Sequence, residues 1–287
     1  MWRPLPTVAR MARQDCSSGG LNRQRTGLPG LPGRRFREAR ASLRQNSRVS
    51  DTILITGANR GIGLGLAAAY AGDGWQVIAS CRRPDKAEAL KTLAARSAGR
   101  VRLEYLDVAY PASIDDLASR LAGQSLDLLI NNAGAIGPRD PQGSQLHRQR
   151  FGSLDYEAWL EVLRVNALGP MKMAEAFLPH LETGRQKKIA TLSSSIGSIS
   201  EARAPAYLYA TSKTALNKAL TLLADELKPR GISVGIYCPG HVKTELGGEG
   251  ASVEVADSVA GLRSLIASLD LQSSGCFRRY DGAAVAW

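Results

Sequence analysis

TGANRGIG at residues 56–63 decides the fold of this chain. The stretch follows an apolar run at 52–56 and precedes an amphipathic segment at 61–71, so its glycines lie between a strand and a helix. Such a turn lets a pyrophosphate approach backbone N–H groups at a helix N-terminus, where the helix dipole favours an anion. The motif therefore predicts a nucleotide contact rather than a purely structural turn, made by Gly57, Asn59, Arg60, Gly61, Ile62 and Gly63.

The rest of the chain repeats the same alternation of short apolar runs and amphipathic segments, which is typical of βαβ units. We predict strands at 52–56, 76–80, 101–106, 126–131, 188–193, 233–237 and 276–280. We predict helices at 61–71, 86–96, 113–122, 155–181, 207–228 and 255–268. A chain of 287 residues holds one large α/β domain and is too short for two. The expected fold is a single α/β domain at 51–287 with a doubly wound, parallel, seven-stranded sheet, the Rossmann fold.

Positive charge is concentrated at the start of the chain. Residues 1–49 hold eleven Arg against Asp15 and Glu38, which accounts for most of the formal net charge of +11. We expect residues 1–50 to be a disordered Arg-rich extension. It can be an artefact of the assigned translation start, a genuine tail or a mitochondrial transit peptide. The remaining residues are nearly balanced in charge, so neither a nucleic-acid nor a membrane partner is expected.

The cysteines point to the cellular compartment. Cys16, Cys81, Cys238 and Cys276 are widely spaced and form no CxxC pair. This spacing indicates neither a zinc site nor a disulfide framework. Reduced thiols are expected, and with them a cytoplasmic location.

The end of the second predicted strand bears on the choice of cofactor. NAD-binding folds usually place Asp or Glu there to bond the ribose 2′-hydroxyl, but this chain has ASCRR at 79–83. Arg82 and Arg60 could instead hold a 2′-phosphate between two guanidinium groups. We therefore predict NADP, with NADPH favoured over NADH. The alternative is that both arginines are solvated surface residues.

Tyr209 and Lys213 are four residues apart on a predicted helix and so share one face. A phenol with a pKa of about 10 is a weak acid at neutral pH. A lysine at about 5 Å would lower the pKa of the phenol by about two units. The pair can thus form a general acid, although a surface pair on a helix would have the same spacing.

The order of the motifs resembles that of the short-chain dehydrogenases/reductases over residues 51–287. The glycine turn is followed by Asp107, the stretch NNAG at 131–134, Asn166, a serine cluster at 193–195, the pair Tyr209 and Lys213, and PG at 239–240. Within that family, the segments after the fifth strand and the C-terminal ending resemble C-factor and the sniffer-type carbonyl reductases. The resemblance implies an enzyme that reduces a carbonyl substrate with NADPH, with Tyr209 as proton donor.

The resemblance also implies individual roles. The catalytic residues would be Asn166, Ser194, Tyr209 and Lys213, with Asn166 holding a water behind Lys213. Further cofactor contacts would come from Asp107, Val108, Asn132, Ala133, Gly134, Tyr209, Lys213, Pro239, Val242 and Thr244. Ser194 is 15 residues before Tyr209 instead of the usual 13, so Ser195 stays an alternative.

Partners and rival functions complete the expectations. The expected partner is a small-molecule aldehyde or ketone, and the expected assembly is a homodimer or a homotetramer. One rival function is a C-factor-like signalling protein that binds NAD(P) with little turnover. Another is a sugar-nucleotide epimerase, which usually has a larger C-terminal part than the 43 residues that follow Thr244 here.

Overall fold

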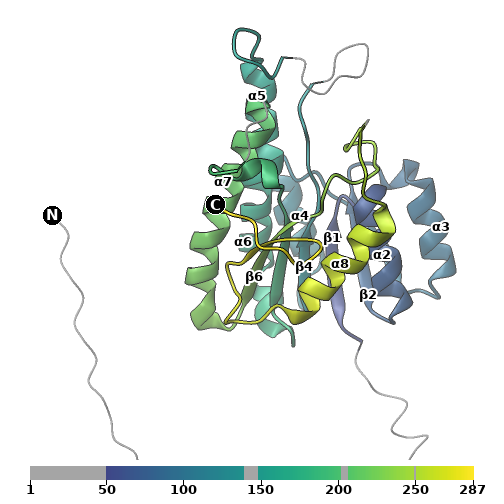
Figure 1. Ribbon diagram of the computed structural model, residues 1–287. Helices are drawn as coiled ribbons and strands as arrows, with labels where there is room; N and C mark the ends of the chain where they lie inside the picture. Colours follow the sequence, from purple (N-terminus) through teal and green to yellow (C-terminus); the bar gives the residue numbers. More distant parts are fainter. Residues whose placement is uncertain (1–49, 139–147, 202–205, 249) are drawn as a thin grey trace, which may run out of the picture. The chain divides into compact units, whose positions relative to one another are not determined.

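The computed structural model describes residues 50–138, 148–201, 206–248 and 250–287; the expected extension at 1–49 lies outside the described residues. One parallel sheet of seven strands runs through the unit Val49–Trp287, in the order β3-β2-β1-β4-β5-β6-β7 (Figure 1). The strands are β1 (Thr52–Thr56), β2 (Gln76–Cys81), β3 (Val101–Tyr105), β4 (Leu128–Asn131), β5 (Lys188–Leu192), β6 (Ser233–Cys238) and β7 (Phe277–Arg279). The predicted doubly wound parallel sheet is confirmed.

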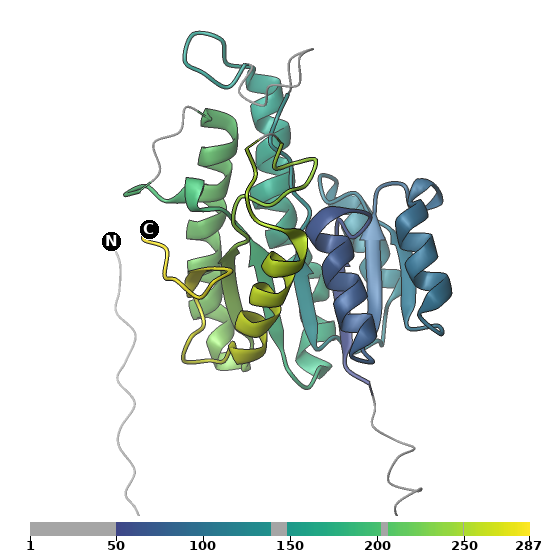
Figure 2. The ribbon, with the colours of Figure 1, turned by 45° about the vertical axis from the view of Figure 1, so that its right-hand side comes forward.

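Helices cover both faces of this sheet. They are α2 (Gly61–Gly72), α3 (Glu88–Arg96), α4 (Pro111–Arg120), α5 (Tyr156–Leu163), α6 (Gly169–Thr183), α7 (Tyr207–Leu227) and α8 (Val255–Ser268). Helices α2 and α8 pack side by side, and both views show them together with α3 on one face (Figures 1 and 2). Helices α4, α6 and α7 form the other layer, because their apolar residues share one buried cluster.

The two hydrophobic cores follow from the alternation of side chains along each strand. Ile53 and Ile55 of β1 pack into the cluster beneath α2 and α8, whereas Leu54 between them belongs to the cluster beneath α4, α6 and α7. Successive side chains of a strand point to opposite faces, and a parallel sheet covered on both faces is apolar on both. Leu54 pairs in register with Ile78 of β2 and Leu129 of β4. These pairings hold β1 between β2 and β4.

One predicted helix differs from the structure. The segment expected as a single helix at 155–181 is α5, a π-helical turn at Arg164–Leu168 and α6. Asn166 lies in that wider turn, with its side chain bonded to the main chain of Ala135. Gly169 follows, so close to Val108 that an added Cβ would lie 2.7 Å from the Val108 carbonyl oxygen. Contacts with the loops after β3 and β4 thus accompany the change of helix type, and π turns occur frequently at functional sites.

Other boundaries shift by one or two residues. Strand β4 begins at Leu128 and not at 126, because the Leu126 amide donates to the His180 carbonyl of α6. The carboxyl ends of β1 to β6 all meet one edge of the sheet. The strand order reverses between β1 and β4, and such a switch point is where doubly wound sheets bind ligands.

Candidate active site

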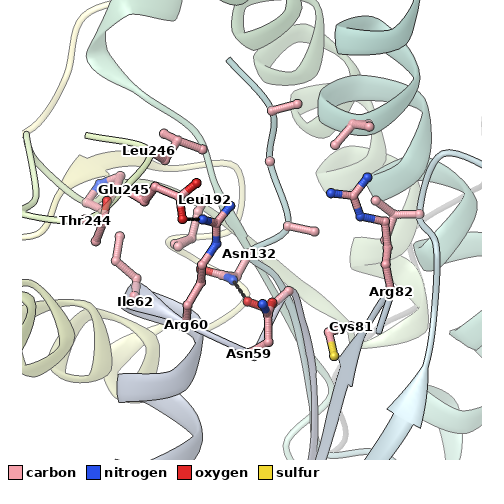
Figure 3. A pocket seen from close by; sticks show the side chains of 18 of the residues that line it. Asn59, Arg60, Ile62, Cys81, Arg82, Asn132, Leu192, Thr244, Glu245 and Leu246 are labelled. Carbon is pink, nitrogen blue, oxygen red and sulfur yellow. Dashed lines mark hydrogen bonds and ion pairs between the residues drawn. The ribbon is translucent and has the colours of Figure 1, made fainter. Parts of the chain in front are cut away.

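A cavity of about 570 Å³ opens at this edge of the sheet. Its lining includes all but four of the residues that the sequence predicts for the site: Gly57, Asn59, Arg60, Gly61, Ile62, Arg82, Asp107, Val108, Asn132, Ala133, Gly134, Tyr209, Lys213, Pro239 and Thr244. The four outside the lining are Gly63, Asn166, Ser194 and Val242. Side chains far apart in the sequence thus meet around one space (Figure 3).

The glycine turn is shaped by close backbone contacts. Gly57 has φ +66°, and a Cβ there would lie 2.9 Å from Ala133 Cα. Gly63 is buried in α2, where a Cβ would meet the Gly57 oxygen at 2.4 Å and Asn132 Nδ2 at 2.5 Å. Asn132 Nδ2 donates to the carbonyl oxygens of Thr56, at 2.8 Å, and of Gly57, at 3.0 Å. The turn therefore needs small residues and brings its backbone to the cavity wall, which fits the cradle of a dinucleotide.

Two arginines reach the cavity from different elements. Arg60 precedes α2 and forms an ion pair with Glu245 of the segment after β6. Arg82 follows β2, and Figure 3 shows its guanidinium group reaching toward the same space from a separate side. Both Arg60 and Glu245 are more than half exposed, with exposed side-chain fractions of 55% and 64%. The arginines can thus meet a charged ligand, but Arg60 already has a carboxylate partner.

Asp107 and Val108 follow β3 and form part of the wall near Arg82. Asp107 Oδ1 accepts a hydrogen bond from the Ala109 amide at 3.0 Å, and the Asp107 amide donates to Ser113 Oγ at 3.0 Å. These two bonds hold the Asp107 backbone at the start of α4. The carboxylate is therefore fixed in orientation next to the cavity.

Ser194 and Tyr209 lie close together, with Tyr209 in the cavity lining and Ser194 outside it. Ser194 ends the extended segment after β5, and its hydroxyl accepts a hydrogen bond from the Ile196 amide at 3.3 Å and lies close enough to the Tyr209 phenol on α7 to lower the pKa of that phenol. The amide of Ser195 instead donates to Cys238 Sγ at 3.2 Å. The geometry thus brings Ser194, the serine expected from the motif, to Tyr209, in spite of the longer connecting loop.

The ionisation of Tyr209 and Lys213 differs from the expectation. Burial, with a smaller contribution from the nearby Cys238, raises the pKa of Tyr209 to about 12, and the Ser194 hydroxyl opposes this shift. Burial lowers the pKa of Lys213 to about 8. The expected decrease of the phenol pKa by the lysine charge is wrong for the free protein, because burial disfavours the charged form of both groups. Lys213 Nζ lies 5.8 Å from the centre of the Tyr209 ring.

Lys213 and Asn166 both lie next to the loop after β4. Lys213 Nζ donates to the Leu192 carbonyl at 2.8 Å. Asn166 accepts from the Ala135 amide at 2.8 Å and donates to the Ala135 oxygen at 2.7 Å and to Ser212 Oγ at 2.9 Å. Its side chain is fully buried, so it binds protein groups on both edges of its amide. Asn166 therefore couples the π turn to the residue before Lys213.

Three contacts around the site are not predicted by any motif or spacing in the sequence. Glu245 pairs with Arg60, as described above. The Gln149 side chain donates to the Ile136 oxygen at 2.7 Å and accepts from the Tyr209 amide at 3.3 Å, so it caps the first turn of α7. Val242 forms a bridge with Val253 and is buried behind the wall. None of these contacts is visible in local spacing.

The described part of the chain lacks two kinds of feature. No helix within it is both long and apolar enough to cross a bilayer. It also contains no cluster of three or more His, Cys, Asp or Glu side chains suited to a metal ion.

Known proteins resemble this chain in both sequence and structure. The short chain dehydrogenase family model matches residues 51–253. The C-signal protein of Myxococcus xanthus is 34% identical over 171 residues, which are 59% of this chain and 98% of that protein. The NADPH-bound carbonyl reductase from chicken fatty liver superposes with a TM-score of 0.74 at 31% identity, over 83% of this chain and 99% of that one.

The carbonyl reductase Sniffer of D. melanogaster is similarly close. Its structure gives a TM-score of 0.73 at 30% identity and covers 83% of this chain and all of that one. The family match extends over more than half of the chain and contains the glycine turn, the serine cluster and the pair on α7. This chain therefore belongs to the short-chain dehydrogenase family and is an oxidoreductase.

Proposed function

We propose that the protein reduces an aldehyde or ketone to an alcohol with NADPH. The observation that carries this proposal is that Tyr209 and Lys213 line the same cavity as the glycine turn, with Ser194 next to the Tyr209 phenol. A carbonyl placed there would have an acid and a hydrogen-bond donor on its oxygen. Oxidation of an alcohol is the same path reversed.

Several features support NADP as the cofactor. The residues directly after β2 are Arg82 and Arg83 and not an acid, and the guanidinium groups of Arg60 and Arg82 border the cavity. Two similar carbonyl reductases carry this cofactor: the chicken protein was solved with NADPH, and one from Pseudomonas aeruginosa PAO1 was solved with NADP. We assign the pyrophosphate to the backbone between Gly57 and Gly63, the 2′-phosphate to the two arginines, and the adenine to Asp107 and Val108.

The remaining predicted residues are assigned to the nicotinamide end. The ribose would contact Asn132, Ala133, Tyr209 and Lys213, and the carboxamide would lie near Pro239 and Thr244, with Gly134 beneath. Val242 is buried outside the lining, so we assign it the support of Thr244 from behind. The bound cofactor would supply a hydride to the carbonyl carbon.

The protein's own groups would supply the proton. A Tyr209 phenol with a pKa of about 12 is fully protonated at neutral pH, so it can donate its proton to the carbonyl oxygen as that oxygen gains negative charge. Ser194 would hold the same oxygen. Lys213, with a pKa of about 8, is still protonated at pH 7 and would stabilise the phenolate that remains. Asn166 would keep the neighbouring backbone in place for the return of a proton from solvent.

Tyr209→Phe tests this mechanism. The change removes only the hydroxyl, so NADPH binding should survive, while NADPH oxidation over a panel of aldehydes, ketones and quinones should fall by about 10² to 10⁴. Tyr207→Phe is the matched control, because Tyr207 lies on the same helix, is 42% exposed and has no lysine four residues later. Wild-type turnover in Tyr209→Phe would refute the proposed mechanism. Ser194→Ala and Ser195→Ala, compared under the same conditions, identify the serine that acts on the carbonyl.

The likeness to C-signal favours a second candidate function. A signalling protein could bind NAD(P) with little turnover, and the similarity covers almost all of that relative. The two candidates differ in one measurement. Tight NADPH binding without turnover on any carbonyl in the panel would favour signalling, whereas turnover that depends on Tyr209 favours the reductase.

Location and assembly are part of the same proposal. Cys81, Cys238 and Cys276 are free thiols, which supports a reducing compartment such as the cytoplasm. We also propose a homodimer or a homotetramer. Cell fractionation and light scattering of the purified protein test these two points.

A further inference from the structure

A third side chain continues the row formed by Tyr209 and Lys213 on α7. Asn217 follows Lys213 by four residues, as Lys213 follows Tyr209, so all three share one face of the helix. Tyr209 and Lys213 reach the cavity, whereas Asn217 lies one turn beyond it. Asn217 is only 3% exposed, and no role in the proposed reaction has been given to it so far.

The amide of Asn217 binds both ends of the turn that carries Ser194. Ser193 Oγ donates to Asn217 Oδ1 at 2.5 Å. Asn217 Nδ2 donates to the Gly197 carbonyl at 3.4 Å. One buried side chain on α7 therefore spans the segment from Ser193 to Gly197.

Main-chain hydrogen bonds and close packing also hold this segment. The Ser193 amide donates to the Tyr237 carbonyl at 2.7 Å, and the Gly197 amide donates to the Ser194 carbonyl at 2.9 Å. A Cβ on Gly197 would lie 2.9 Å from Lys213 Cβ, so the turn packs directly against α7. Ser194 thus lies between two anchored points, with its hydroxyl next to the Tyr209 phenol.

The two ends differ in how much they depend on Asn217. Gly197 keeps a second donor, because Thr214 Oγ1 also bonds its carbonyl at 3.0 Å. At the other end, the bond to Asn217 is what orients the buried Ser193 side chain toward α7. Loss of the amide should therefore shift the strand end next to Ser194 and leave the helix in place.

We propose that Asn217 is a positioning residue that sets the placement of the Ser194 hydroxyl relative to the Tyr209 phenol. The inference rests on the proposed reductase function, because it concerns the geometry of the same site. Asn217 touches neither the substrate nor the cavity; it acts through Ser193 and the turn.

The test is a double-mutant comparison in the full chain. Asn217→Ala should lower kcat by about 10- to 10²-fold, since misplacement of about 1 Å can cost that much, and NADPH Kd should change by less than about twofold. Ser194→Ala should then cause a much smaller further loss in the Asn217→Ala background than in the wild type, because the hydroxyl is already displaced. If Asn217 served folding alone, the loss of kcat in the double variant would equal the product of the losses in Asn217→Ala and Ser194→Ala.

Ser97→Ala is the matched control. Ser97 is also buried, at 5% exposure, and its hydroxyl makes two hydrogen bonds between α3 and β3, to Ala94 and Val101. This variant should lower Tm without changing kcat. A parallel loss of kcat in Ser97→Ala would show that destabilisation alone slows the enzyme and would overturn the proposal.

Ser193→Ala keeps the test decisive if Asn217→Ala does not fold, because it removes the same bond from the side of the turn. It should show the same small further loss with Ser194→Ala, and multiplicative losses would overturn the proposal. Tyr209→Phe, measured in parallel, distinguishes a failure of the proposed reductase function from a failure of this inference alone. Wild-type turnover in that variant would overturn the reductase function and this inference together, whereas an inactive Tyr209→Phe with multiplicative Asn217 and Ser194 losses would overturn the inference alone.

Discussion

Replacement of Arg60 or Arg82 by glutamine should weaken the binding of NADPH much more than the binding of NADH. Both side chains border the cavity, and only NADPH offers them a 2′-phosphate. The two variants should not be equivalent, because Arg60 is paired with Glu245 in the free protein. NADPH has to replace that carboxylate at Arg60, whereas no ion pair of Arg82 is present within the described residues.

The magnitudes follow from these partners. A charge-assisted hydrogen bond contributes roughly 1.5 to 3 kcal/mol, so Arg82→Gln should weaken NADPH by about 10- to 10²-fold. An ion pair as exposed as Arg60 and Glu245 contributes about 0.2 to 1 kcal/mol. The loss of NADPH affinity in Arg60→Gln should therefore be smaller than the loss in Arg82→Gln, by a factor of about 1.4 to 5. Glu245→Gln should tighten NADPH by the same factor of about 1.4 to 5 and leave NADH unchanged.

Titration calorimetry with NADPH and NADH on all three variants measures these effects. The ratio of the two Kd values is the decisive quantity, because a variant that merely loosens the fold weakens both cofactors alike. Equal losses of NADPH and NADH in the arginine variants would refute the assignment of the 2′-phosphate. Weaker NADPH binding in Glu245→Gln would refute the competition at Arg60.

Four further outcomes are expected. Because burial lowers the pKa of Lys213 to about 8, reduction should slow as pH rises through 8 and the ammonium is lost; a pH profile that rises there would contradict its role. The same shift leaves the folded state with fewer protons than the unfolded chain between pH 8 and 10.5, so Lys213 makes the free energy of unfolding rise with pH in that window, as urea titrations can check. Gly63→Ala should lower stability by about 1 to 3 kcal/mol and weaken NADPH, whereas Gly72→Ala in the same helix, with no atom within 4 Å of its added Cβ, should not; equal melting curves would argue against the tight turn. A chain starting at Ser50 should keep the Tm and turnover of the full chain, and a large decrease in Tm by calorimetry would show that the extension packs on the domain.

The sequence alone determined the features that depend on local spacing. Short apolar runs between amphipathic segments predicted the seven strands, because strands of a parallel sheet that is covered on both faces are apolar on both sides. The glycine turn and the pair Tyr209 and Lys213 were equally local, since each lies within a single turn or on a single helix face. Most of the residues predicted for the site therefore line one cavity.

Only the tertiary structure decided the contacts between distant segments. The pairing of Arg60 with Glu245, the cap that Gln149 places on α7, and the bond of Asn217 to Ser193 join residues that no periodicity relates. The pKa values of Tyr209 and Lys213 also changed in an unexpected direction, because their spacing on the helix predicts attraction but not burial. Burial depends on how the sheet, the serine turn and α7 pack around both groups, and the desolvation of a charge outweighs a favourable neighbour once water is excluded.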